Sequence, residues 1–366
     1  MSEYQYYEFQ AVDRPLTEEE QRAVSRLSSR VDPHPRRAIF VYHWTGFPGN
    51  PKKILADYYD AMYYVANWGT TRLMFRFPKS LIDTRQIEAY CWDDYVTCET
   101  SGEYVILDMF QADEEGYSDW VEGEGTLDGL LRLRDDILQQ DYRVLYLAWL
   151  AGIASLEVTE GTVEPPVPPG LKELTAPLRR FVEAFHLDEA LVNVAAEASA
   201  DRSQLPSSDL RQRIAALPRE ACDEWLLRLA RGEEPHLSLA LRQFLEPSRV
   251  ITQSAQKRRS VGELLARAEA ARDRLKRQAA AEAETRRIRE LEALAPKAEE
   301  TWISALQLLE QGYSHYDEVV ELLVKLHNLA IHQGTEEAFA GRLQQIRATY
   351  PRRKGLLVRL DEAGLP

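Results

Sequence analysis

The feature that most constrains this chain is a charged, alanine-rich run from Lys257 to Pro296. Ser260 and Glu263 have the spacing of a helix-starting capping box, and Pro296 forces a boundary at the other end. Between the cap and this proline the run contains no other proline. A helix of about 35 residues would be about 50 Å long. The sequence therefore predicts one long helix, over 257–296, between two parts of different composition.

The apolar positions of this long helix cluster at its two ends, and its middle offers only alanine. Such a seam is too weak for a stand-alone coiled coil, so we expect the ends to pack and the centre to stay in water. Residues 257–297 carry 12 basic and 7 acidic side chains, which we interpret as a solvated face with i,i+4 charge pairs. The alternative is contact with nucleic acid, although no aromatic side chains interleave for base stacking. The basic residues that would make this contact are Lys257, Arg258, Arg259, Arg286 and Arg287.

Length, charge and cysteine content set broad limits. At 366 residues, two to three domains are expected. A net charge of -14 argues against a general coat for DNA or RNA and against an anionic membrane surface as the main partner. No apolar run is long enough to span a bilayer, and the first ten residues lack the features of a signal peptide. Cys91, Cys98 and Cys222 form no C-x-x-C pair, so we expect reduced thiols and a cytoplasmic location.

Residues 1–155 form an aromatic part of the chain, with 14 of the 17 tyrosines and 5 of the 7 tryptophans. Their order of strands and helices predicts an α+β fold that begins with a mixed α/β sheet covered by helices on one face. A ferredoxin-like or related split arrangement is one possibility. Alternating patterns predict strands over 3–12, 37–44 and 70–77 and a hairpin of 95–100 with 104–110. Amphipathic patterns predict helices over 17–29, 52–67 and 80–91.

The predicted helix over 52–67 is unusually rich in aromatic residues. Tyr59 and Tyr63 would share one face of this helix, and Trp68 would follow its end. Because neighbouring tyrosines on a helix cannot all point inward, we expect some aromatic area at the surface, where it favours a protein interface. The alternative is a large aromatic core with tyrosine hydroxyls at its rim. These three residues are the candidate interaction residues of the domain.

The rest of the chain predicts an all-α region. The proline-rich stretch 156–170 is typical of a stiff, extended linker between domains. Beyond it, 171–250 predicts a small helical domain, with helices over 171–186, 187–199, 207–216, 218–231 and 236–245. After the long helix, 298–366 predicts a C-terminal bundle, with helices over 298–311, 316–332, 336–350 and 353–362. The first two of these resemble one tetratricopeptide-type hairpin.

No familiar catalytic motif accompanies these elements. The sequence lacks the common nucleotide-binding loops, the hydrolase nucleophile elbow, the zinc-protease helix motif and any C-x-x-C pair. We therefore predict no catalytic residue, cofactor or metal. One enzymatic alternative stays open, with a site near His43, Trp44 and Arg72, and it requires a concave pocket beside them.

Two stretches of the aromatic domain, EYQYYEFQAVDRPL at 3–16 and YVANWGTTRLMFRFP at 64–78, resemble a family of uncharacterised bacterial proteins. The likeness continues through SGEYVILDMF, the acidic loop with Asp119 and Trp120, the VGELLARAE helix and the DEVVELLVKL tail. Members of that family are often encoded beside a protein with a SWIM-type zinc finger. The resemblance implies no established activity, cofactor or catalytic residue, and it makes such a zinc-finger protein a plausible partner.

These observations predict a non-catalytic, cytosolic protein–protein interaction or scaffold protein. The aromatic domain would dock one partner, and the C-terminal helices would dock a second partner or a copy of the chain. The alternative is an accessory subunit of a nucleic-acid-associated or defence complex, which would use the basic positions of the long helix and Arg352–Lys354. The enzyme with a site in the N-terminal domain is the second alternative.

Overall fold

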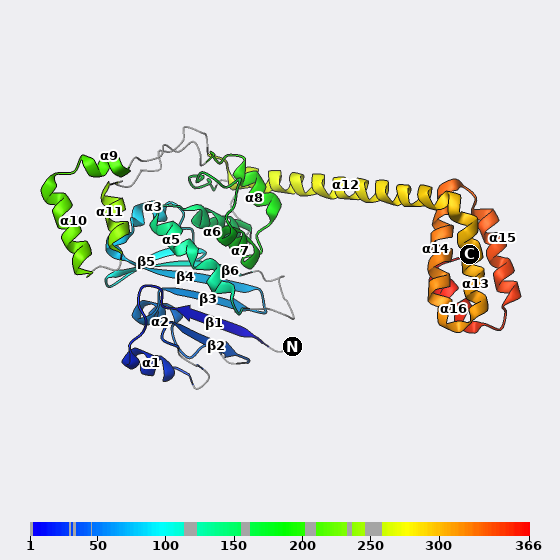
Figure 1. Ribbon diagram of the computed structural model, residues 1–366, viewed down its shortest axis with the longest axis horizontal. Helices are drawn as coiled ribbons and strands as arrows, with labels where there is room; N and C mark the ends of the chain where they lie inside the picture. Colours follow the sequence, from blue (N-terminus) through cyan, green and yellow to red (C-terminus); the bar gives the residue numbers. More distant parts are fainter. Residues whose placement is uncertain are drawn as a thin grey trace. The chain divides into compact units, whose positions relative to one another are not determined.

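The computed structural model describes residues 3–28, 31, 34–44, 46–112, 123–154, 162–201, 210–232, 236–245 and 258–366. The chain divides into two compact units, Met1–Arg272 and Asp273–Pro366, which we call unit 1 and unit 2. Among the described residues, unit 1 contains two clusters of buried apolar side chains, and unit 2 contains one. The predicted α+β class is confirmed, with a sheet near the N-terminus and helices over most of the remainder (Figure 1).

Unit 1 is built on a six-stranded antiparallel sheet with the strand order β2-β1-β3-β4-β6-β5. Most of the predicted strands are confirmed, including the hairpin that turns between Ser101 and Tyr104. The order differs from the ferredoxin-like possibility because an unpredicted strand, β3, stands between β1 and β4. The strands are β1 (Gln5–Gln10), β2 (Arg37–Tyr42), β3 (Ala61–Ala66), β4 (Thr70–Pro78), β5 (Val96–Ser101) and β6 (Tyr104–Ala112).

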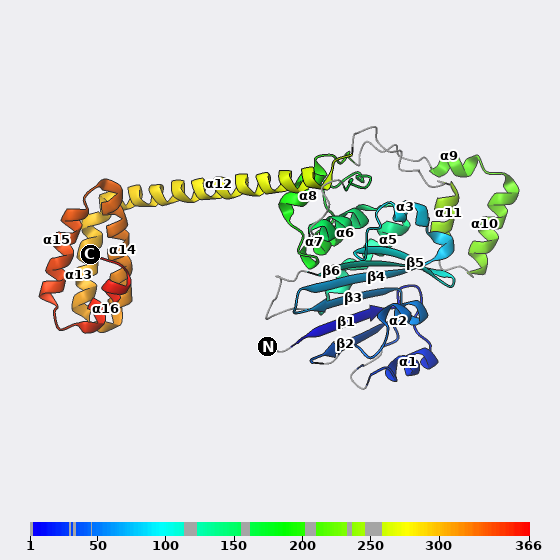
Figure 2. The ribbon, with the colours of Figure 1, turned by 180° about the vertical axis from the view of Figure 1, so that it is seen from behind.

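Helices cover both faces of this sheet, not one face as the sequence predicted (Figure 2). The physical reason is that β3 is buried along its whole length and alternates apolar side chains between the two faces. Met62 joins one core cluster and Tyr63 joins the other. One face packs against α1 (Glu18–Ser25) and α2 (Pro51–Tyr58). The other packs against α4 (Thr126–Leu130), α5 (Arg132–Leu138), α6 (Arg143–Ala154), α7 (Ala176–Ala184) and α8 (Glu189–Ala196), while the short α3 (Thr84–Glu88) precedes β5.

The predicted helix over 52–67 is wrong in its second half. Helix α2 ends at Tyr58, and the chain continues as β3, which is paired with β1 on one side and β4 on the other. A short, fully apolar run does not distinguish a buried strand from a buried helix by periodicity alone. Tyr59 and Tyr63 therefore share no helix face. Both lie in the interior, with exposed fractions of 0% and 3%.

Helix α6 is formed by the most apolar run of unit 1, and this run is buried in the interior. Its sequence, RVLYLAWLAGIA, is apolar all round, and every residue from Arg143 to Ile153 is buried. Such a helix belongs in the middle of a layer, between the sheet and other helices. Among the described helices, none combines the length and the apolar character that crossing a bilayer requires.

The long helix begins and ends where its caps predict. Helix α12 (Val261–Leu294) starts with a reciprocal capping box, in which the Ser260 N–H donates to Glu263 Oε2 at 3.0 Å and the Glu263 N–H donates to Ser260 Oγ at 3.2 Å. Pro296 lies in the 3-10 turn that separates α12 from the next helix. Every residue from Arg272 to Arg287 is exposed, as expected for a wet centre.

The remaining helices of unit 1 are thinly buried. These are α9 (Leu210–Ala215), α10 (Arg219–Arg231) and α11 (Leu237–Leu245), each within a few residues of its predicted position. Neither α9 nor α10 contains a buried residue, and α11 buries only Leu237 and Leu245. Unit 1 runs through the predicted linker over 156–170, of which 156–161 lie outside the described residues. The acidic loop with Asp119 and Trp120 also lies outside them.

In unit 2, which also includes α12 from Asp273 onward, α14 contacts α13, α15 and α16. The core of unit 2 includes Trp302, Leu323 and Phe339, and the last helix contributes Leu356 to it. The predicted helices of this part are confirmed within two residues at each end. They are α13 (Ala298–Gln311), α14 (Tyr316–Gln333), α15 (Glu336–Thr349) and α16 (Lys354–Glu362).

Candidate functional site

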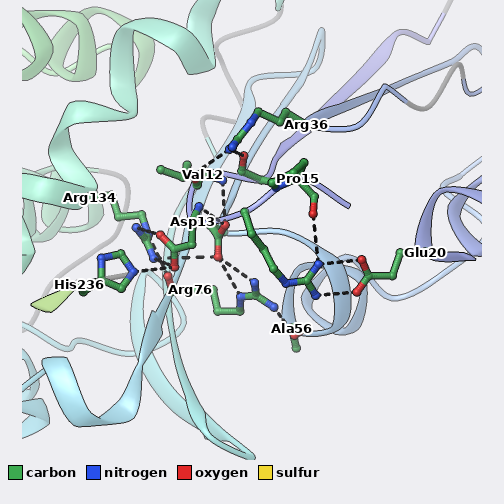
Figure 3. Close-up of polar contacts among 12 residues, drawn as sticks. Val12, Asp13, Pro15, Glu20, Arg36, Ala56, Arg76, Arg134 and His236 are labelled. Carbon is green, nitrogen blue, oxygen red and sulfur yellow. Dashed lines mark hydrogen bonds and ion pairs between the residues drawn. The ribbon is translucent and has the colours of Figure 1, made fainter. Parts of the chain in front are cut away.

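A cluster of buried charge lies where the chain leaves β1, beside β4 and α5 (Figure 3). Asp60 is 2% exposed, and its Oδ1 accepts hydrogen bonds from Arg76 Nη2 at 2.8 Å and from Arg76 Nε at 3.2 Å. Its Oδ2 accepts the backbone N–H groups of Val12 at 2.8 Å and Asp13 at 3.0 Å. Asp60 therefore ties the end of β1 to the arginine on β4.

A second carboxylate, Asp13, extends this cluster towards α5 and α11. Arg134 is 1% exposed, and its Nη1 and Nη2 donate to the two carboxylate oxygens of Asp13 at 2.8 Å each. His236 Nε2 lies 3.1 Å from Asp13 Oδ2. Burial alone would raise the pKa of Asp13, but the close contact of His236 and the hydrogen bonds and charge of Arg134 outweigh it and lower that pKa to about 2.

The charged groups of the cluster are matched by partners within the chain. Arg76 Nη1 donates to the carbonyl oxygen of Ala56 at 2.7 Å, and Arg134 Nε donates to the carbonyl oxygen of Arg76 at 3.0 Å. The two arginines also lie over the rings of Tyr104 and Phe77, at 4.3 Å and 5.4 Å from the ring centroids. Because these charged groups already have partners within the chain, the cluster fits a structural role, in which it holds the β1–α1 connection against β4 and α5. We call this cluster of Asp13, Asp60, Arg76 and Arg134 the structural joint.

A cavity of about 460 Å³ adjoins this joint at His236. It lies between the end of α5 and the helices α9 and α11. Its lining is mainly apolar, with Leu138, Leu210 and Ile214 among the contributors, and Asp135 and Arg242 add charge. The volume falls within the range of small-molecule pockets, about 300–1,000 Å³.

The residues proposed for an enzymatic site do not line this cavity. His43 lies against Tyr4, with ring centroids 5.5 Å apart, and Trp44 is 65% exposed. Arg72 is engaged in a two-pronged pair with Asp108, in which its Nε lies 2.7 Å from Oδ1. Lys52 Nζ adds a further contact to Asp108 Oδ2 at 3.1 Å. Arg72 is thus held by an acid of the neighbouring strand.

The predicted aromatic interaction residues are mostly internal. Tyr59 packs against Phe9 in one core cluster, with ring centroids 5.5 Å apart, and Tyr63 belongs to the other cluster. Trp68, at the β3–β4 turn, is 36% exposed. The alternative interpretation of this region, a large aromatic core, describes Tyr59 and Tyr63.

The predicted basic residues fall into two groups. Lys257 lies outside the described residues, and Arg258, Arg286 and Arg287 are exposed. Arg287 has a loose pair with Glu284 at 3.7 Å. The exposed side chains remain accessible to a polyanion.

Arg259, by contrast, is engaged in hydrogen bonds within unit 1. Its Nε and Nη2 donate to the two oxygens of Glu164 at 2.9 Å and 2.6 Å, and its Nη1 donates to the carbonyl oxygen of Val194 at 2.8 Å. The hydroxyl of Tyr146 also donates to Glu164, which is 2% exposed. This arginine joins the start of α12 to α6 and α8, and a phosphate would have to displace Glu164 to reach it.

An exposed apolar face on α10 escaped the sequence analysis. Leu226, Leu227 and Leu229 are 60%, 56% and 65% exposed, and we call these three residues the α10 leucine face. The inner side of the helix carries Trp225, whose ring lies 5.6 Å from that of Phe244 on α11. The signal was present in WLLRL, because four large apolar side chains within five residues spread over more than half of a helix circumference. One helix side cannot bury all of them.

Unit 2 has its own exposed apolar side chains on α13. Ile303 and Leu306 are 49% and 38% exposed, and Tyr313, just after the helix, is 85% exposed. Ile303 and Leu306 stand three residues apart and therefore share one face of the helix. We call these two residues the α13 apolar face.

The described residues offer little for metal or thiol chemistry. Within them, no group of three or more His, Cys, Asp or Glu side chains is placed to hold a metal ion. Burial raises the pKa of the Cys91 thiol to about 11 and that of the Cys98 thiol to about 12. Both thiols are therefore protonated, and weakly nucleophilic, at neutral pH.

Comparison with known proteins adds no family to this description: no family model, no curated protein and no solved structure matches the chain.

Proposed function

We propose that this chain is a non-catalytic interaction protein of the cytoplasm that links two binding surfaces through one continuous polypeptide. One observation carries the proposal: the run from Arg272 to Arg287 on α12 is exposed throughout, while unit 1 and unit 2 each have a core of their own. A helix segment that contributes to neither core serves as a connection between two separately folded bodies.

The chemistry of the two units supports binding over catalysis. The buried charges of unit 1 are matched to one another, so they favour a structural joint over a reactive site. Each unit also exposes large apolar side chains, on the α10 leucine face and the α13 apolar face. Burying each of these leucines or isoleucines would contribute about 1–2 kcal/mol to an interface.

The test uses the full-length chain as bait in a lysate of the native organism, followed by chemical cross-linking and mass spectrometry. We expect cross-links to partners from both units. The variant Leu226→Glu/Leu229→Glu should remove the cross-links of unit 1 alone, and Ile303→Glu/Leu306→Glu should remove those of unit 2 alone. A SWIM-type zinc-finger protein, which the sequence resemblance implies, is a partner to test directly. A bait that captures no protein, or two variants that change nothing, would refute the proposal.

A second function is favoured by the exposed charges of α12. Between Arg272 and Arg289 there are seven basic and three acidic side chains, and all ten are exposed. That local excess of positive charge is suited to a phosphate backbone. If it binds nucleic acid, affinity should fall steeply with salt, and Arg286→Glu/Arg287→Glu should reduce the logarithmic salt slope by about 2. The matched control reverses two exposed arginines, Arg22 in the last turn of α1 and Arg26 at its C-cap, and should leave the slope unchanged.

A further inference from the structure

The cavity beside His236 has mainly apolar walls, to which α9 contributes one side. Helix α9 contains no buried residue, and its Leu210 and Ile214, one turn apart, both line the cavity. A space of about 460 Å³ is far larger than the voids that a close-packed protein interior leaves. A ligand with an apolar body would give the apolar side of α9 the packing that it lacks. The leucine and isoleucine side chains of the walls are Leu138, Leu210, Ile214, Leu239, Leu241 and Leu245.

The same cavity is lined by polar side chains that have no partner. Asp135, on α5, and Arg242, on α11, make no side-chain hydrogen bond or ion pair within the described part of the chain. The same is true, among the described residues, of the carboxamide of Gln139 and the hydroxyl of Ser238. A ligand that satisfies all four groups needs a cation, an anion and groups that donate and accept hydrogen bonds.

Asp135 lies near the start of α11. Its neighbour Arg134 donates to Asp13, and His236, just before α11, lies 3.1 Å from the same carboxylate (Figure 3). His236 also lines the cavity, so this shared contact sets one end of it. Because Asp13 is already matched by Arg134 and His236, Asp135 is the acid that remains for a ligand.

Arg242 lies near the other end of α11. Its neighbour Gln243 donates to the carbonyl oxygen of Leu138, in the last turn of α5, at 3.3 Å. The stretch from His236 to Arg242 rises about 9 Å along the helix direction. The two free charges therefore lie towards opposite ends of the cavity, which suits a ligand whose own charges are far apart.

We propose that this cavity binds a short apolar peptide of about three residues with both termini free. Its ammonium group pairs with Asp135, and its carboxylate pairs with Arg242, whose guanidinium can meet both carboxylate oxygens. Its peptide groups meet Gln139 and Ser238, and its side chains pack on the leucines of the walls. An extended tripeptide is about 10 Å long, close to the rise between the two ends of the cavity. The site is separate from the α10 leucine face and the α13 apolar face, so it goes beyond the proposed function and does not depend on it.

The first measurement is isothermal titration calorimetry of the full chain with the tripeptide Leu-Ala-Leu, for which we expect saturable binding. N-acetylation removes the ammonium charge and C-amidation removes the carboxylate. Each should weaken binding about tenfold, because Asp135 or Arg242 is left without a partner. Decanoate, an apolar anion without peptide groups, should bind at least about tenfold more weakly than the free tripeptide.

The second measurement assigns each end of the peptide to its side chain. Arg242→Gln should weaken binding of the free tripeptide about tenfold and leave the affinity for the amidated form unchanged. Asp135→Asn should do the same for the free tripeptide and leave the affinity for the acetylated form unchanged. Both positions are exposed, so neither variant disturbs a packed core. Arg211→Gln, exposed on α9 and outside the lining, is the matched control and should change none of these affinities.

The third measurement places the ligand in the cavity. Ile214 is 45% exposed, so Ile214→Trp puts a larger ring into the cavity without overpacking a core, and it should abolish binding with the urea midpoint unchanged. Absence of saturable binding, blocked peptides or decanoate that bind as tightly as the free tripeptide, or wild-type affinity in Ile214→Trp would each overturn the inference. None of these results affects capture of protein partners by either unit.

Discussion

The substitution of Asp60 is the sharpest test of how unit 1 is held together. The side chain makes four hydrogen bonds, two with the guanidinium of Arg76 and two with the backbone N–H groups of Val12 and Asp13. Asp60→Ala leaves a buried arginine without its acid and two N–H groups without an acceptor. Breaking a buried pair in this way costs about 3–5 kcal/mol of unfolding free energy, so we expect a loss of about 4 kcal/mol.

Two further variants divide that loss between charge and hydrogen bonding. Asp60→Asn keeps an acceptor oxygen for the backbone N–H groups and turns an amide towards Arg76, so we expect a loss of about 2 kcal/mol. Arg76→Met removes the other partner, and in the double variant no charge is left uncompensated. The double variant should therefore be more stable than the sum of the two single losses, by about 2 kcal/mol.

The assay is urea unfolding of the full chain, followed by circular dichroism and by tryptophan fluorescence. Because the chain has two compact units, two transitions are expected, and only that of unit 1 should move. Asp57→Asn, at an exposed position of α2, is the matched control and should change stability by less than about 0.5 kcal/mol. An Asp60→Ala loss below about 1 kcal/mol, or strictly additive losses in the double variant, would show that this joint is not what holds the β1 connection.

Three other substitutions test separate contacts. Asp13→Asn should cost about 1–2 kcal/mol of unfolding free energy above pH 4. The difference from wild type should vanish as the pH falls from about 4 to about 2, because the pKa of Asp13 in the folded state is depressed from 3.8 to about 2. Acid titrations of both proteins check this. Glu164→Gln should cost about 2–4 kcal/mol by leaving Arg259 with no acid, and urea midpoints of unit 1 measure it. Gly152→Ala should lower the melting temperature, since its Cβ would lie 2.9 Å from Tyr95 Cβ, and overpacking of about 1–3 kcal/mol exceeds the helix-propensity gain of about 1 kcal/mol.

The parts of the fold that the sequence predicted correctly are those with local signals. The capping box at Ser260 and the proline at 296 fix the ends of α12 within a few residues. The helices of unit 2 follow from glycines and prolines between amphipathic runs, since each helix buries a stripe that is visible at 3.6-residue spacing.

The buried joint could not be predicted, because it has no local pattern. Asp13 and Arg134 are 121 residues apart, and Arg259 and Glu164 are 95 residues apart. A sequence shows that these residues are charged, and only the fold shows that they meet. The same distance in sequence explains why Arg259 was predicted as a surface contact: its place in a run of basic residues is typical of solvent exposure.

The error at residues 59–67 has a more specific cause, which can be tested. The run AMYYVA contains Ala61, Met62 and Ala66, which favour a helix, and it continues the helical spacing of α2. In the folded chain, Tyr59 is already extended, with φ −126° and ψ 168°, and Asp60 is fixed by its four hydrogen bonds. Tertiary contacts, not local preference, therefore convert the chain to β3.

An isolated peptide of residues 51–67 should reveal the local preference that those contacts override. Without β1 and β4 to pair with, residues 61–66 lose every inter-strand hydrogen bond, and we expect them to be helical in trifluoroethanol, together with the α2 segment. Backbone chemical shifts measure this residue by residue. A peptide of residues 70–78, whose two threonines favour a strand, is the control and should show less helix. If residues 61–66 stay extended while 51–58 become helical, the strand is a local preference, and the role assigned to Asp60 in ending α2 is refuted.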